Sequence, residues 1–180
     1  MRFFLGAFVA LLGLMGSAVA ADTLKLDAEK STIEFVGKKT DGAHSGGFKK
    51  FTVDAQADFE DPSKSKLTIA IDATSIWSDD AKLTDHLKNP DFFDVRKYPE
   101  IKFESTKIER VSETKANITG KLTMLGKTAE VTVPCEVAPS DTQIDLTAKF
   151  EIDRTQWGMS YGVGKINKEV PITVKFVFKK

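Results

Sequence analysis

Cysteine and histidine are nearly absent from this chain of 180 residues, which contains one cysteine, Cys135, and two histidines, His44 and His86. A single cysteine cannot form an intramolecular disulfide, so the fold must be held by packing and hydrogen bonds. The two histidines lack the short ligand spacing of a zinc site, and we expect no bound metal. The sequence does not favour a hydrolase triad either, because "GAHSGG" around Ser45 does not match the Gly-x-Ser-x-Gly nucleophile turn. We therefore expect a protein that is not an enzyme.

An excess of charge of either sign is also missing, since 26 basic residues balance 26 acidic ones. The sequence contains no run of basic residues that would favour nucleic acid. Partners bound mainly through charge are therefore not expected, and nucleic acid is not among the expected partners.

Long apolar runs are confined to the first 20 residues. Arg2 precedes an apolar run of 13 residues from Phe3 to Met15, and Ala18-Val19-Ala20 follows as a small-x-small cleavage signal. This run is shorter than the about 20 apolar residues that span a bilayer. Residues 1–20 therefore predict a signal peptide, and residues 21–180 a single domain with no integral membrane segment. We expect a periplasmic or secreted protein. The sequence does not decide between a monomer and a homodimer.

What the sequence does have is alternation with a period of two, which is typical of strands with one apolar and one polar face. Leu125-Gly126-Lys127 separates two such runs as a tight hairpin turn. One-sided faces suit an antiparallel sheet, and closing that sheet removes its exposed edges. We therefore predict an all-β, antiparallel, eight-stranded barrel, although Pro134 within a strand is unfavourable. The predicted strands lie at residues 33–35, 51–57, 67–71, 101–103, 116–124, 129–137, 144–152 and 170–178, with a short additional one at 24–26.

One segment carries helix signals instead. Ser78 can cap a helix, Leu83 and Leu87 lie four residues apart on one face, and Asn89-Pro90 stops it. We predict a short helical insertion around residues 78–94.

Aromatic segments are expected to close the ends of the barrel. Residues 74–99 break the alternation and are expected to form a lid and mouth, where Phe92-Phe93 plugs or gates the opening. Trp157, Met159 and Tyr161 lie in a glycine-rich loop. We expect this loop to cover the opposite mouth, with simple packing beneath the loop as the alternative.

Small residues are frequent on the predicted apolar face. If they point inward, the barrel encloses an open apolar volume; alternatively, they interdigitate with phenylalanines and the barrel is filled. An open interior would suit a long hydrocarbon, because each buried methylene contributes about 0.8 kcal/mol while association costs about 4 to 15 kcal/mol. The small residues are Ala55, Ala57, Ala73, Ala116, Gly120, Ala129, Ala148 and Cys135, the last read as a buried small hydrophobe rather than a reactive thiol.

Three segments, in this order and spacing, resemble the YceI-like family over residues 23–179. They are "HLKNPDFFDVRKYPEIKFES" at 86–105, "ITGKLTMLGKT" at 118–128 and "IDRTQWGM" at 152–159. The chain departs from the family at Leu83-Thr84 and around His44, where other polar residues are usual. Positions that match the family's motifs are His86, Leu87, Phe92, Phe93, Asp94, Tyr98, Pro99, Gly120, Leu122, Gly126, Arg154 and Gly158.

The resemblance implies a lipocalin-like barrel without catalytic residues that encloses a polyisoprenoid or another long-chain lipid. We therefore expect an exported protein that holds a long-chain isoprenoid or similar amphiphile for transport, storage or sequestration. A stress-related structural or interaction protein with a filled barrel is the alternative. No cofactor is expected apart from a bound isoprenoid lipid or isoprenoid quinone. The candidate ligand contacts are Phe35, Phe51, Ile69, Leu83, His86, Leu87, Phe92, Phe93, Phe103, Ile118, Leu122, Phe150, Trp157 and Met159.

Overall fold

The structure is a computed structural model that describes residues 21–179, so the predicted signal peptide lies outside the described residues. Within this range, no helix has the length and apolar character needed to cross a membrane. The elements are β1 (Asp22–Leu26), β2 (Thr32–Lys39), β3 (Gly42–Phe48), β4 (Phe51–Ala57), β5 (Lys66–Asp72), β6 (Ile76–Ser78), α1 (Ala81–Leu87), β7 (Glu100–Ser112), β8 (Lys115–Met124), β9 (Lys127–Pro139), β10 (Gln143–Asp153) and β11 (Glu169–Lys179), with short 3₁₀ turns η1 (Pro62–Lys64), η2 (Ala73–Ser75) and η3 (Arg154–Trp157).

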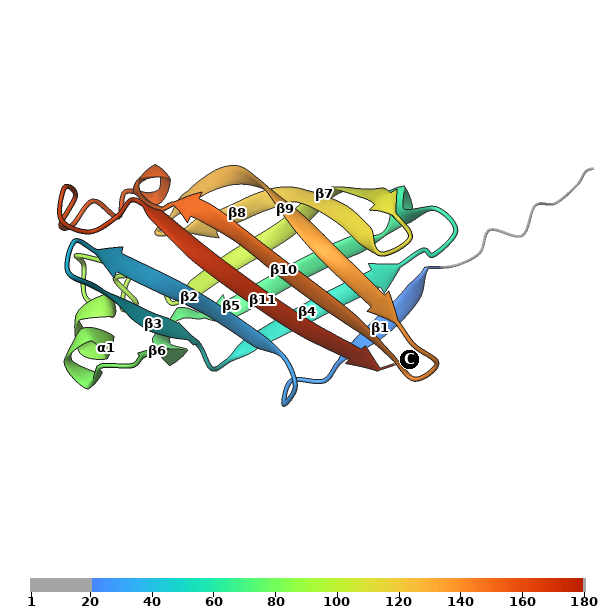
Figure 1. The fold of residues 1–180 in the computed structure, drawn as a ribbon, viewed down its shortest axis with the longest axis horizontal. Helices are drawn as coiled ribbons and strands as arrows, with labels where there is room; N and C mark the ends of the chain where they lie inside the picture. Colours follow the sequence, from blue (N-terminus) through green and yellow to red (C-terminus); the bar gives the residue numbers. More distant parts are fainter. Residues whose placement is uncertain (1–20, 180) are drawn as a thin grey trace, which may run out of the picture.

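The strands close into an antiparallel barrel of eight staves, as the alternation predicted (Figure 1). Three staves are each interrupted near their middle, so that β1 continues into β2, β3 into β4, and β5 into β6. In the ring, these three staves are followed by β7, β8, β9, β10 and β11. Pairing of β11 with both β1 and β2 closes the ring.

Two of the half-staves carry no clear apolar alternation and were not predicted. β3 is rich in glycine because its backbone passes close to bulky neighbours. A Cβ atom on Gly46 would lie 2.6 Å from the Phe35 ring, and one on Gly47 would lie 3.0 Å from the Trp77 ring nitrogen. The second unpredicted half-stave, β6, is only three residues long and pairs with β3.

Turn chemistry fixes the register of the strands that were predicted best. Leu125 and Gly126 have φ of 54° and 71°, which confirms the tight hairpin between β8 and β9. Pro134 is accommodated because pairing of β9 with β10 begins only at Cys135. From there toward the β8–β9 turn, β9 pairs with β8 alone among the described strands.

The helix and the glycine-rich loop lie at the same end of the barrel (Figure 1). The helix cap is Asp80, whose side chain accepts a hydrogen bond from the Leu83 N–H, so the prediction of Ser78 as the cap was wrong. Ser78 belongs to β6. The expectation that the loop covers the opposite mouth was also wrong, because the Tyr161 ring lies 5.3 Å from the Phe92 ring that follows α1.

Candidate functional site

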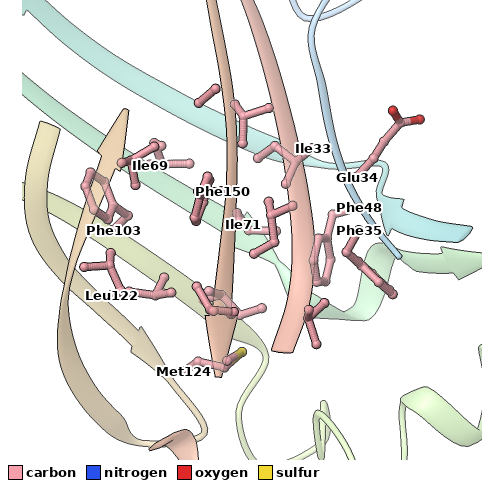
Figure 2. Close-up of a pocket in the computed structure, with 18 of the residues that line it drawn as sticks. Ile33, Glu34, Phe35, Phe48, Ile69, Ile71, Phe103, Leu122, Met124 and Phe150 are labelled. Atoms are coloured by element: carbon pink, nitrogen blue, oxygen red, sulfur yellow. The ribbon is translucent and has the colours of Figure 1, made fainter. Parts of the chain in front are cut away.

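An apolar cavity occupies the barrel interior at the end capped by α1 (Figure 2). Its volume is about 190 Å³, compared with about 10–15 Å³ for a single buried water on the same measure. The exposed wall formed by the described residues is entirely apolar. Glu34 lies on β2 between the lining residues Ile33 and Phe35, and its exposed carboxylate points away from the apolar side chains. The chemistry of this wall suits hydrocarbon rather than a polar solute.

Strand alternation explains which side chains reach the cavity. Along β10, Ile152, Phe150 and Ala148 line it, while Lys149 and Glu151 between them are exposed on the outer face. The same alternation operates on β5, where Ile69 and Ile71 point inward. All eight staves contribute lining residues, most of them by this alternation, so the wall needs no specialised motif.

Large and small inward residues are used in two different ways. The Phe103 ring folds over Gly120, where a Cβ atom would lie only 2.4 Å from it, so this pair interdigitates. Ala148 and Cys135 line the cavity directly and leave space in front of them. The two expectations for the small residues therefore hold at different positions, and the interior contains an open volume.

Most of the predicted contact residues lie together around the cavity. Four do not line it: Phe51, Leu83, His86 and Trp157. The ten that do are Phe35, Ile69, Leu87, Phe92, Phe93, Phe103, Ile118, Leu122, Phe150 and Met159.

Each of the four outlying residues has another environment. Phe51 packs its ring 5.8 Å from that of Phe176, and Leu83 packs partly buried against the core. Trp157 is fully buried and donates a hydrogen bond from Nε1 to the Leu122 carbonyl at 2.9 Å. His86, the fourth, packs its ring against those of Phe92 and Tyr161.

Several lining residues were not among the candidates. Most are aliphatic residues on the same inward faces, so alternation alone identifies them once every inward position is counted. Phe48 carried no such signal, because it ends the glycine-rich strand β3. The additional apolar lining residues are Ile33, Phe48, Leu67, Ile71, Ile101, Met124, Val131, Val133, Cys135, Leu146, Ala148, Ile152, Ile166, Val170, Ile172, Val174 and Phe176.

Two aromatic clusters lie at the capped end. The Phe93 ring packs edge-on against Phe48 at 5.6 Å and lies 6.4 Å from Phe35. His86 forms the second cluster with Phe92 and Tyr161, each with its ring 5.0 Å away. His86 also hydrogen-bonds Asp91 at 2.9 Å. Residues 86–93 thus connect the cap to the cavity, with the polar atoms of His86 directed outward.

Arg154 holds the loop that completes this end. Its guanidinium is buried and donates hydrogen bonds to the carbonyls of Met159 at 2.7 Å, Asn167 at 2.9 Å and Ile166 at 3.3 Å. Burial lowers the pKa of Arg154, while Asp153 opposes that shift. Since arginine stays protonated in proteins, these carbonyls share a buried positive charge.

Two histidine–aspartate pairs lie near the capped end, His86 with Asp91 and His44 with Asp79. His44 hydrogen-bonds Asp79 at 2.8 Å, and Asp79 also accepts from the Ser45 N–H. The bond from Ser45, followed by that from His44, lowers the pKa of Asp79. Among residues 21–179, no group of three or more His, Cys, Asp or Glu residues is arranged to hold a metal ion.

Cys135 is the one thiol on the cavity wall. Burial raises its pKa to about 12, and its Sγ lies 3.4 Å from the Val133 carbonyl. A thiol with such a pKa is protonated at neutral pH and is a poor nucleophile.

Comparison with sequences of known proteins gives consistent partial matches. A UPF0312 protein of Pseudomonas putida strain GB-1 is 41% identical over 87 residues, which are 48% of this chain and 45% of that protein. A UPF0312 protein of Pseudomonas savastanoi pv. phaseolicola is 31% identical over 122 residues, or 66% of this chain and 62% of that protein. The chain thus spans about half the length of the first of these relatives and under two thirds of the second.

Solved structures share the barrel over most of the chain. BcnA of Burkholderia cenocepacia superposes with a TM-score of 0.80 at 29% identity, covering 85% of this chain and 99% of that one. A polyisoprenoid binding domain from Saccharophagus degradans has the same fold, with a TM-score of 0.70 at 15% identity, covering 89% and 99% of the two chains. The model of the YceI-like domain matches residues 24–178. By this match over nearly all of the described residues, the chain belongs to the YceI-like family.

Proposed function

We propose that this protein binds the hydrocarbon chain of a long isoprenoid lipid, or of a similar amphiphile such as an isoprenoid quinone, inside its barrel. The observation that carries the proposal is the cavity inside the barrel, whose exposed wall is entirely apolar. The polyisoprenoid binding domain of the same fold supports this ligand class. The pattern of residues 1–20 supports action in the periplasm or outside the cell, where such a protein would transport, store or sequester the lipid.

The energetics favour a long chain over a small apolar molecule. Burial of one methylene contributes about 0.8 kcal/mol, and association costs about 4 to 15 kcal/mol. A chain of about 5 to 19 methylene equivalents is therefore needed merely to offset the cost of association, before burial alone gives any affinity. The wall offers no polar partner that would compensate for a shorter ligand.

A polar head group would remain at the capped mouth. There the helix contributes His86, and the neighbouring strand and turn contribute His44 and Asp79, all partly exposed. Burial of a charged head group without partners is unfavourable by several kcal/mol. The lipid therefore lies with its chain inside and its head toward α1.

The chemistry of the wall supports binding rather than catalysis. Cys135 is the only thiol on it, and its raised pKa of about 12 makes it unreactive at neutral pH. Arg154 is among the residues that line the cavity, but its guanidinium donates its hydrogen bonds to backbone carbonyls.

Filling the cavity tests the proposal. Ala148→Phe places a ring inside the cavity, whereas Ala138→Phe places the same ring on the exposed outer face of β9. Uptake of octaprenol from phosphatidylcholine vesicles should be lost only in Ala148→Phe, with unfolding free energy changed by less than about 1 kcal/mol in both variants. The opposite result is that overpacking lowers the free energy of unfolding of Ala148→Phe by about 1 to 3 kcal/mol. If that is found and the wild type takes up no octaprenol, the barrel is filled and the proposal fails.

A further inference from the structure

A second cavity lies inside the barrel at the end away from α1. Its volume is about 240 Å³, and its inner wall is apolar. Small side chains leave this space open, with Ala55 on β4 and Ala116 on β8 among its lining residues. Ile144 and Phe178 are buried beside them and contribute to the wall.

The order of residues along each strand places the two cavities end to end. On β8, Leu122 lines only the main cavity, Ile118 lines both, and Ala116 lines only the second. Since strands rise about 3.3 Å per residue, Ala116 lies about 7 Å beyond Ile118 along the strand.

Two other strands, β10 and β5, repeat this order. On β10, the main cavity is lined by Ala148, both cavities by Leu146, and the second by Ile144. On β5, which runs beside β7, Ile69 lines the main cavity and Leu67 lines both. The boundary therefore falls at the same level on three strands.

The boundary is formed by three aliphatic side chains, Leu67, Ile118 and Leu146. They come from β5, β8 and β10, which are alternate staves of the ring, and inward side chains of alternate staves share one layer of a barrel interior. These are the residues that line both cavities. Aliphatic side chains change rotamer without breaking a hydrogen bond, so such a layer can constrict the interior without sealing it permanently.

We infer that the second cavity receives the far end of a long hydrocarbon chain, and that Leu67, Ile118 and Leu146 determine which chain lengths are bound. The inference rests on the proposed function and adds a length-dependent specificity to it. A short chain occupies only the main cavity and does not pass beyond the layer. A long chain passes between the three side chains and gains further apolar burial around Ala55 and Ala116.

The rim of the second cavity is polar, and a hydrogen bond holds one of its side chains in place. Lys66, Arg110 and Lys115 line it together with Glu113. Arg110 donates a hydrogen bond from Nη2 to the Phe59 carbonyl at 2.7 Å, which links β7 to the segment after β4. This rim sets a polar limit to the apolar interior, and we expect the end of the longest bound chain to stop there.

Narrowing the second cavity alone tests the inference. Ala116→Leu adds a larger side chain there and leaves every residue specific to the main cavity unchanged. The control, Ala138→Leu, makes the same exchange on the exposed outer face of β9. Wild type and variants are offered farnesol, with three isoprene units, and octaprenol, with eight, in phosphatidylcholine vesicles, and both affinities are measured.

Each methylene that loses its buried site weakens binding by about fourfold. Ala116→Leu should therefore weaken octaprenol binding by at least about tenfold and leave farnesol binding within about twofold of the wild type, while Ala138→Leu changes neither. Ala55→Leu, which narrows the same cavity from β4, should reproduce the pattern and replaces Ala116→Leu if that variant fails to fold.

Equal effects on the two prenols, or no effect on octaprenol, would overturn the length-dependent specificity while leaving the proposed function intact. Failure of the wild type to bind either prenol would refute the proposed function, and the inference with it.

Discussion

Replacing Arg154 by methionine should destabilise the capped end and with it the whole barrel. Methionine is unbranched and close to arginine in length. It carries neither the positive charge nor the hydrogen-bond donors of the guanidinium. The carbonyls of Met159, Ile166 and Asn167 then lose the hydrogen bonds that hold the loop over the cavity.

The magnitude follows from how deeply each partner is buried. The bond to Met159 lies entirely in the interior, and leaving a buried acceptor unpaired costs about 1–3 kcal/mol. The bonds to Ile166 and Asn167 are only partly buried, so water recovers part of their loss, about 0.5–1.5 kcal/mol each. Removing the buried charge itself offsets some of this cost, because the charge no longer has to be desolvated. We therefore expect a net loss of about 2–4 kcal/mol in the free energy of unfolding.

Urea unfolding at pH 7, followed by far-ultraviolet circular dichroism, measures this loss. The slope of the free energy against urea should stay unchanged, because the same surface is exposed on unfolding. Arg110→Met is the matched control, since exposed Arg110 donates to one carbonyl, and it should cost less than about 1 kcal/mol. If the two variants are equally stable, the role assigned to Arg154 in holding the loop is refuted.

A glycine substitution and the reactivity of Cys135 also test the packing of the interior. Gly120→Ala should lower the free energy of unfolding by about 1–3 kcal/mol, because its Cβ would lie 2.4 Å from the Phe103 ring and 2.5 Å from the Glu104 carbonyl. Gly37→Ala, whose nearest contact would be 4.0 Å away, should change it by less than about 0.5 kcal/mol in a thermal or urea titration, and equal losses would contradict the packing described. Cys135, with its pKa of about 12, should resist a chromogenic disulfide reagent at pH 8 in the native state and react fully in urea. The native reaction should accelerate as the pH rises because the thiolate is the reactive form, and rapid labelling at pH 8 would show that the wall is open to solvent at this position.

The alternation of apolar and polar residues was sufficient to predict the closed antiparallel barrel. Strands such as β8 and β10 bury one face, and burial selects apolar side chains at every second position. The glycine-rich β3 escaped this reasoning, because Gly46 and Gly47 are required by the close approach of Phe35 and Trp77, which only the folded chain reveals.

The candidate site was predicted in part for the same reason. Phe35, Phe103 and Phe150 lie on inward faces, and the structure places them on the cavity wall. Phe51 and Trp157 were also predicted to contact the ligand, but Phe51 packs against Phe176, and Trp157 is buried and donates a hydrogen bond to the Leu122 carbonyl. The layer of Leu67, Ile118 and Leu146 depends on the stagger between strands, and a sequence without register information cannot predict which three residues share a level.

The central claim is that the apolar interior holds a hydrocarbon chain, and native mass spectrometry of the protein purified from its own host without detergent tests it most directly. We expect a mass increment that organic extraction releases as a long-chain lipid, at one lipid per chain. Recovery of the bare polypeptide, combined with no uptake of octaprenol when it is offered, would contradict the account.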